Sequence, residues 1–590
     1  MSSLASPAAR SRGADLLLVA AIVLGGVQGA RHWWYCDDAF IGYRYAQHLA
    51  AGEGLVFNPG ERVEGYTDLL WVLWNALPFY FGSGPEVWAN LSGLTSYVAC
   101  LGLLGVLQQS RARALYGERA AQTWPLAALA GALHPDWNDY ATSGIETTPF
   151  ALAVLAAYAV LVWKELTPRR AAWAGTLFAV ATLLRPEGLM LGALGGLYVL
   201  WQAPRRVACA AAFAAAVALF WGPAQVWRML YYGDFWPNTY YAKSAELSWY
   251  GQGAQYTWSY LAKYWTLLAL PPLAVWVWRK VSQADDAAGA PRSAWPEIVL
   301  ALALWGSYAF SVLRVGGDFM YARLFIHVAP LGLVALERLW ECAALSRRGV
   351  YAAGALILVA GPFATQAAYP YNLLAYSVAD EARLYSPEVG RQQDVNGLEL
   401  LRYTEGVPVR VLIFGSEARI VYRARLHDVL EGHGLTDRTI ARRPLAGRGR
   451  PGHEKIPTLD YVLIDRKIQF LFRPDAYAEP MQFNRVIPYY TAHFGSIEAF
   501  VLTWDPAIMR ALWAKGVRSR DFLADLDAYL ADLPNVPRAK LADDYARFWN
   551  FYFAHTDDPA RERPFLERLG LKARPSGLLF PERFAQEHGR

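Results

Sequence analysis

Apolar windows recur about eleven times in the first 370 residues, and they constrain the fold more than any other feature of the chain. The windows are residues 16–30, 87–107, 120–133, 150–163, 171–184, 189–201, 207–230, 260–277, 298–312, 325–339 and 350–368. A helix of about 20 apolar residues crosses the roughly 30 Å hydrocarbon core of a bilayer, and shorter windows fit if their helices tilt, re-enter or continue beyond the apolar part. The windows predict a polytopic α-helical membrane protein with about eleven transmembrane helices.

Composition supports this class and excludes others. Of the 590 residues, 55% are hydrophobic, with 24 Trp and 34 Tyr, which is more apolar surface than a soluble enzyme needs. The net charge of +5 is small for this length and its basic residues lie in short loops, so nothing favours nucleic-acid binding. The four cysteines are far apart in the chain, so no disulfide framework or zinc site follows from their spacing.

The positions of the basic residues predict which loops face the cytoplasm. Residues 69–81 are also apolar, and placing them in the membrane interface, not across the bilayer, brings the basic clusters to one side. Those clusters are Arg10 and Arg12; Arg111, Arg113 and Arg119; Lys164, Arg169 and Arg170; Arg205 and Arg206; Arg279, Lys280 and Arg292; Arg347 and Arg348. Because Lys and Arg are enriched in cytoplasmic loops, we expect the acidic and Gly-rich loops on the outer face of a bacterial plasma membrane. Arg10 and Arg12 favour an uncleaved signal anchor over a cleaved signal peptide.

Two domains are expected. A transmembrane domain should cover residues 1–370, with its first outer loop at 31–86, and an extracytoplasmic α/β domain should cover 371–590. In the second domain, strands are expected at 409–414, 461–464 and 499–503. Helices are expected over 507–541, interrupted by Pro534 and Pro537, and again from residue 545.

Two adjacent carboxylates, Asp37 and Asp38, follow the first apolar window and an aromatic run of Trp33, Trp34 and Tyr35. Ionised groups beside hydrocarbon are costly, so they usually mark a wet functional site at the membrane face. The alternative is a solvated interfacial loop or a helix start. The Gly-rich loop that comes next, residues 50–67, is suited to holding a polar ligand.

Further polar clusters follow the apolar windows on the same expected side, at residues 134–146, 185–188, 231–243 and 314–323. A carboxylate in these loops could take a proton from an attacking hydroxyl, and cations could hold a phosphate leaving group. Aromatic side chains beside them suit sugar faces and polyprenyl chains.

Six of these motifs together resemble the membrane glycosyltransferases of the GT-C superfamily, and within it the terminal arabinofuranosyltransferases of mycobacterial cell-wall arabinan and their bacterial relatives. The motifs are Asp37-Asp38-Ala39-Phe40, residues 54–65, Ser143-Gly144-Ile145-Glu146, Arg185-Pro186-Glu187-Gly188, Pro237-Asn238-Thr239 with Lys243, and Gly317-Asp318. The resemblance runs from Asp37 to about Lys455 and includes residues 434–437 and 452–455. It implies a GT-C fold, a polyprenyl-phosphate sugar donor, an extracytoplasmic active site and an acid of the first outer loop as the catalytic group. Residues 65–68 depart from the mycobacterial pattern, which leaves the sugar and the acceptor open.

We therefore predict a glycosyltransferase that moves a sugar, with arabinofuranose expected, from a polyprenyl phosphate to a hydroxyl of a glycan, glycolipid or protein. Asp38 is the predicted catalytic carboxylate and Asp37 its partner. The predicted phosphate-binding residues are Arg185, Lys243 and Arg323, because a charged leaving group needs paired cations. The candidates for sugar or acceptor binding are Asn58, Glu64, Glu146, Asn238, Asp318 and His453. No cofactor is predicted, and a divalent metal is not expected because Arg and Lys can hold a monophosphate alone.

Several alternatives stay open at this point. A transporter or lipid flippase would show inverted repeats and charges at the bilayer midplane, whereas the charges here lie at the ends of the windows. A non-catalytic envelope assembly protein would need no acids in the first outer loop. Single residues also have ordinary roles: Glu64 in an ion pair, Glu146 at a helix start, Asp318 in a turn, and Lys243 or Arg323 at the end of a span. Inversion and retention at the anomeric carbon are not distinguished by two adjacent acids.

Overall fold

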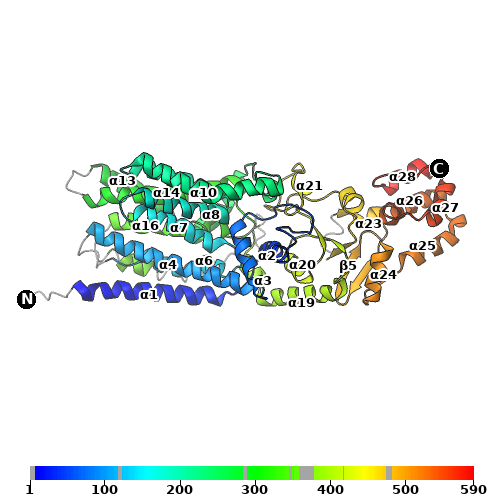
Figure 1. Cartoon of the computed structure of the whole chain (residues 1–590), viewed down its shortest axis with the longest axis horizontal. Coiled ribbons are helices and arrows are strands. Elements are labelled where there is room, and N and C mark those ends of the chain that lie inside the picture. Colours follow the sequence, from blue (N-terminus) through cyan, green and yellow to red (C-terminus); the bar gives the residue numbers. More distant parts are fainter. Residues whose placement is uncertain are drawn as a thin grey trace, which may run out of the picture.

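The computed structural model describes residues 7–116, 123–283, 289–343, 349, 351–357, 378–415, 417–472 and 481–589. A helical bundle and a smaller mixed domain follow one another along the long axis, with the N-terminus at the far end of the bundle and the C-terminus at the far end of the mixed domain (Figure 1). The helices of the bundle are α1 (Pro7–Arg31), α4 (Glu86–Tyr116), α5 (Leu126–Ala132), α6 (Pro135–Tyr140), α7 (Thr147–Val162), α8 (Pro168–Leu184), α9 (Glu187–Gln202), α10 (Arg206–Tyr232), α11 (Asn238–Ala242), α12 (Tyr250–Lys263), η2 (Trp265–Ala269), α13 (Leu270–Gln283), α14 (Gly289–Val315), α15 (Arg323–Ile326) and α16 (Ala329–Ala343).

Four helices of the described residues are long and apolar enough to cross a membrane. They are Gly13–Arg31, Glu86–Arg111, Arg206–Tyr232 and Ala294–Val315. The expected number of about eleven is therefore not confirmed. The helices α7, α8 and α9 have 16, 17 and 16 residues, which at about 1.5 Å per residue is shorter than a bilayer core of roughly 30 Å.

Other expected spans are interrupted or only partly described. The window at 260–277 is divided among α12, η2 and α13, and the window at 120–133 contains only the seven-residue α5 among its described residues. Most of the window at 350–368, together with the expected domain boundary near 370, lies outside the described residues. Apolar composition alone did not reveal these breaks, since a helix can stop inside an apolar run.

The apolar segment at 69–81 forms α3 (Leu69–Tyr80), a helix of 12 residues. At about 1.5 Å per residue it is much too short to span a bilayer. Leu73, Trp74 and Leu77 are each 40% exposed, so one face of α3 is apolar and uncovered. This geometry matches the expectation that the segment lies in the membrane interface.

The C-terminal domain contains a six-stranded sheet with the order β2-β1-β3-β5-β4-β6. Its strands are β1 (Arg410–Ile413), β2 (Asp428–Glu431), β3 (Phe470–Phe472), β4 (Thr491–Phe494), β5 (Ile497–Val501) and β6 (Arg518–Ser519). β1 pairs in parallel with β2 and β3, and the remaining pairs are antiparallel. The strands expected at 409–414 and 499–503 are thus confirmed as β1 and β5.

The strand expected at 461–464 is wrong, because Tyr461–Asp465 forms a π-helical turn. The Tyr461 backbone N–H donates to the Thr458 hydroxyl at 3.2 Å, which starts a turn there. A short apolar run has no periodicity that separates strand from helix. The helices of this domain are α18 (Glu381–Leu384), α19 (Pro387–Thr404), α20 (Ala418–Ala424), α21 (Arg438–Ala441), α23 (Phe483–Val486), α24 (Pro506–Ala514), α25 (Phe522–Ala531), η5 (Leu533–Asn535), α26 (Arg538–Phe548), η6 (Trp549–Phe553), α27 (Pro559–Leu569) and α28 (Pro581–His588).

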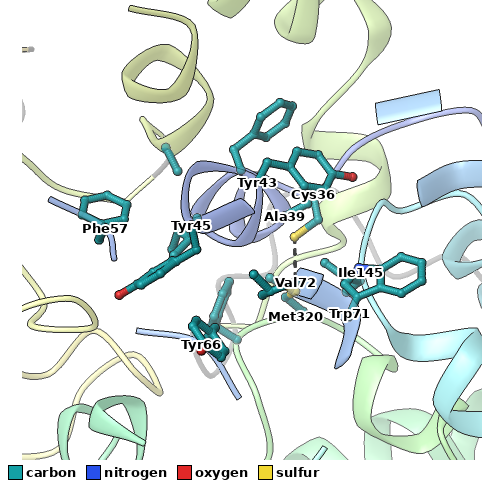
Figure 2. Packing of buried hydrophobic residues seen from close by; sticks show 14 of the residues in the cluster. Cys36, Ala39, Tyr43, Tyr45, Phe57, Tyr66, Trp71, Val72, Ile145 and Met320 are labelled. Atoms are coloured by element: carbon teal, nitrogen blue, oxygen red, sulfur yellow. Dashed lines mark hydrogen bonds between the residues drawn. The ribbon is translucent and has the colours of Figure 1, made fainter. Parts of the chain in front are cut away.

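The first loop after α1 joins the two domains. It contains α2 (Asp37–Ala50), which packs against α3 on one side and against α20 of the C-terminal domain on the other. Figure 2 shows Tyr43 and Tyr45 of α2 within a buried cluster that also includes Trp71 and Ile145. The Arg44 side chain is fully buried and donates to the backbone oxygen of Leu426 at 2.6 Å. The middle of α2 is therefore held between the bundle and the C-terminal domain.

Candidate active site

A cavity of about 560 Å³ lies where the bundle meets the C-terminal domain. It is lined by the start of α2, the start of α3, the loops before α7, α9 and α15, the segment between α10 and α12, and residues 448–454 of the C-terminal domain. Of the residues predicted for the site, Asp38, Glu146, Arg185, Lys243, Asp318 and Arg323 line it. Asp37, Asn58, Glu64, Asn238 and His453 are not among the lining residues.

Asp37 and Asp38 are the first two residues of α2, and the structure separates their surroundings. Consecutive helical residues point about 100° apart, so the two side chains cannot share one environment. The Asp38 side chain is 29% exposed, lines the cavity and lies 3.5 Å from Arg323. Asp37 is buried and accepts the backbone N–H groups of Ala418 and Arg419, both at 3.2 Å.

Burial raises the pKa of Asp37 to about 7, although the N–H groups of Arg419 and Ala418 oppose the shift. These two N–H groups belong to the first turn of α20, whose backbone dipole also favours a negative charge. Asp37 thus joins α2 to the C-terminal domain.

Arg323 is fixed by a carboxylate of its own loop. Its Nη2 lies 2.6 Å from Asp318, and both side chains are almost fully buried. The turn that leads into Asp318 depends on Gly317, whose φ is +76°, and a Cβ there would lie 2.4 Å from the Tyr256 ring. Asp318 therefore holds the Arg323 side chain in place beside Asp38 and also neutralises its positive charge.

Arg185 is also paired within the protein. Its Nη1 lies 2.6 Å from Glu146, and its Nη2 lies 2.9 Å from Glu187. Asp68, the residue before α3, lies in the same part of the cavity wall. Burial raises the pKa of Asp68, and the charge of Glu146 raises it further.

Two cations of the cavity wall, Lys243 and Arg314, have no carboxylate partner among the described residues, although Arg314 donates to the backbone oxygen of Glu246 at 3.1 Å. Arg448, by contrast, pairs with Glu454 at 3.1 Å. Aromatic side chains lie beside them, with Trp236 and Tyr240 stacked at 5.3 Å. An incoming anion would find Lys243 and Arg314 available, whereas Arg185 and Arg323 already neutralise acids.

The predicted residues outside the cavity wall hold the surrounding structure together. Glu64 pairs with Arg228 at 2.7 Å, and burial raises its pKa to about 7. Asn58 bonds to both backbone groups of Val429 in the edge strand β2, at 2.9 and 3.0 Å. Asn238 donates to the backbone oxygens of Gly434 and Leu435 at 2.8 and 3.0 Å.

His453 packs edge-on against Phe319 and His433, and burial lowers its pKa to about 3. Its neighbours Gly452 and Glu454 line the cavity, so the segment reaches the site although the His453 ring does not.

Sequence reasoning missed several residues of the cavity wall. Glu187, Asp68 and Arg314 lie inside motifs that had been singled out, so their signal was present. Arg448 comes from a domain more than a hundred residues away from the other cations, and no local pattern links it to them. The described residues contain no group of three or more His, Cys, Asp or Glu placed to hold a metal ion.

Comparison with known proteins shows similarity to two glycosyltransferases. No family model matches the chain. It is 29% identical over 352 residues to the terminal β-(1→2)-arabinofuranosyltransferase of Corynebacterium glutamicum, covering 52% of this chain and 49% of that protein. It is 29% identical over 444 residues to the enzyme of the same description from Mycobacterium tuberculosis, covering 66% of this chain and 68% of the relative. The chain thus spans about half the length of the first relative and two thirds of the second.

The fold has a solved counterpart. ArnT from Cupriavidus metallidurans bound to undecaprenyl phosphate superposes with a TM-score of 0.51 at 13% identity, over 82% of this chain and 97% of ArnT. The chain therefore shares the fold of ArnT and is similar in sequence to the two arabinofuranosyltransferases. The resemblance expected from the motifs is thereby confirmed, and the apolar helices agree with a membrane location.

Proposed function

We propose that this protein is a glycosyltransferase that moves arabinofuranose from a polyprenyl phosphate to a hydroxyl of a cell-envelope glycan, glycolipid or protein. The names of the two relatives support the sugar, and the undecaprenyl phosphate bound to ArnT supports the lipid carrier. The observation that carries the proposal is Asp38, a partly exposed carboxylate in a cavity whose wall also offers Lys243 and Arg314, which pair with no carboxylate of the described residues.

In this reaction the bond between the anomeric carbon and the phosphate oxygen breaks, and a bond to the acceptor oxygen forms. Asp38 acts either as the base that takes the acceptor proton in a single displacement or as the nucleophile of a double displacement. The polyprenyl phosphate leaves with its negative charge, which Lys243 and Arg314 stabilise through charge-assisted hydrogen bonds. Arg323, held by Asp318, orients the Asp38 carboxylate.

The proposed active site faces the outside of the cell. The helix α7 begins beside the cavity at Glu146 and ends beside exposed Lys164 at the other end of the bundle. Arg111 lies at that other end too, because it donates to the backbone oxygen of Trp163. The positive-inside rule assigns this basic end to the cytoplasm, which leaves the cavity and the C-terminal domain outside.

The direct test is transfer by the purified full-length protein. With a polyprenyl-phosphoryl-arabinofuranose donor labelled in the sugar, the wild-type enzyme should release or transfer the label. Asp38→Asn keeps the size of the side chain but removes the charge, so the rate should fall by about a hundredfold to ten-thousandfold. Glu53→Gln, in the same loop but outside the cavity wall, is the matched control. A wild-type protein that leaves the labelled donor intact with every acceptor class would refute the proposal.

A further inference from the structure

Lys455 is a buried cation that forms no ion pair with a carboxylate of the described residues. It lies in the loop after α21, and the residue is only 7% exposed. Its Nζ donates to two backbone oxygens, that of Tyr241 at 2.8 Å and that of Ala441 at 2.6 Å. Burying an ammonium group is costly unless its hydrogen bonds are satisfied, so these two contacts are what the position requires of a lysine.

The two acceptor oxygens lie at the ends of short helices in different domains. Tyr241 is in the last turn of α11, which belongs to the bundle, and Ala441 is the last residue of α21 in the C-terminal domain. The carbonyl oxygens that end a helix lack partners within the helix, and a lysine side chain is a favourable donor to them. Lys455 therefore ties the end of α11 to the end of α21.

The other end of α11 is attached to the same domain. Its first residue, Asn238, donates to the backbone oxygens of Gly434 and Leu435. With Asn238 bonded at its start and Tyr241 bonded near its end, α11 is held by the C-terminal domain along its whole length.

Lys243 is the residue directly after α11, and its side chain passes over the loop that contains Lys455. A Cβ at Gly452 would lie 3.4 Å from Cε of Lys243 and 3.5 Å from its Cγ, so the aliphatic stem of Lys243 runs along the Gly452 backbone. Lys243 and Gly452 both line the cavity, whereas Lys455 does not. Residues 452–455 thus support Lys243 twice, under its stem and through the backbone that precedes it.

We propose that Lys455 is a positioning residue of the donor phosphate site, which acts through the Tyr241 carbonyl to hold Lys243 where it can meet the phosphate. Charge-assisted hydrogen bonds need a donor within about 3 Å of the acceptor, so the backbone that carries Lys243 must be fixed. The inference rests on the proposed function and deepens it, because it gives residues 452–455 a role in binding the donor.

The test is a double-mutant cycle on the full-length protein, with the Kd for polyprenyl phosphate without a sugar as the readout. Lys455→Met keeps the length of the side chain and removes its charge, so the Kd should rise about tenfold, as for the loss of one charge-assisted contact. In a Lys243→Ala background the same substitution should raise the Kd by less than about threefold, because the contact that Lys455 supports is already gone. Lys515→Met, on the exposed surface of the same domain, is the matched control and should not alter the Kd.

Equal effects of Lys455→Met in both backgrounds, or no effect in either, would overturn the inference. Wild-type protein that binds polyprenyl phosphate no more tightly than Lys243→Ala would also overturn it, since Lys243 would then make no contact to be positioned. If Lys455→Met does not fold, Gly452→Ala takes its place in the cycle: it adds a methyl group beside the Lys243 stem at a residue whose φ is +77°, and its effect should likewise depend on Lys243. A protein that shows the expected pattern of Kd values but transfers no arabinofuranose would contradict the proposed function alone.

Discussion

Alanine substitutions in the aspartate pair should have opposite effects on stability and on rate. Asp37→Ala removes the acceptor of two buried backbone N–H groups, those of Ala418 and Arg419. A buried donor left without a partner costs about 1 to 3 kcal/mol, so the variant should lose roughly 2 to 6 kcal/mol of stability. Asp38→Ala removes one contact with Arg323 at 3.5 Å from a side chain that is 29% exposed, which is worth about 1 kcal/mol or less.

The two variants should show the opposite order in their rates of sugar transfer. Asp38→Ala should lower the transfer rate by about a hundredfold or more while the melting temperature stays within about two degrees of wild type. Asp37→Ala should lower the melting temperature by several degrees and expose the junction of the C-terminal domain to protease. The melting temperature of Asp37→Asn should lie between those of Asp37→Ala and the wild type, because the amide keeps one acceptor oxygen.

The assay pairs a thermal melt of the detergent-purified protein with transfer of labelled sugar below the melting temperature. Transfer is compared at matched amounts of folded protein, so that loss of fold is not counted as loss of catalysis. A stable Asp37→Ala protein that is inactive, beside a destabilised Asp38→Ala protein that is active, would refute the assignment of roles.

Three further outcomes are expected. Lys243→Ala and Arg314→Ala should each raise the donor KM by about tenfold to a hundredfold, while Lys164→Ala at the opposite end of the bundle should not, and equal effects of all three would exclude phosphate binding at the cavity. The four natural cysteines are buried. A cysteine placed at Tyr489, which is 62% exposed, should therefore react with a membrane-impermeant thiol reagent on intact cells, while one at Lys164 should react only after permeabilisation. Burial raises the pKa of Glu381 from 4.5 to about 8, so the folded protein holds a proton that the unfolded chain has lost between these values. Stability should decline as pH rises through this window, and Glu381→Gln should flatten the decline in melting temperature.

The class of protein could be predicted from the sequence because both signals that carry it are local. Apolar windows and short motifs are readable without tertiary structure, and the resemblance drawn from them is confirmed by the relatives. The number of spans could not be read in the same way. The run 260–277 reads as one apolar window, yet its helix breaks at Tyr264. The only charged residue in the run, Lys263, lies at this break, but one charge inside an apolar window does not mark a helix end.

The sequence also predicted the site only in part: it identified candidate residues but not their partners. The motifs identified Asp38, Arg185 and Glu146, because each lies at a helix start or end where local sequence is distinctive. The motifs did not show which cations were already paired. Arg185 and Lys243 have equal formal charge in the sequence, and only the carboxylates brought near Arg185 by folding distinguish them.

The helical geometry of α2 also explains why the active site needs the C-terminal domain. A rotation of about 100° between neighbouring residues turns Asp38 into the cavity and Asp37 toward α20. The position of Asp38 is thus fixed through its neighbour by backbone groups of a different domain. A movement of α20 that breaks these two hydrogen bonds would release the start of α2 and change the distance between Asp38 and Arg323. Under the proposed mechanism, the C-terminal domain therefore acts on the reaction by positioning Asp38, a role that needs no contact with the substrate.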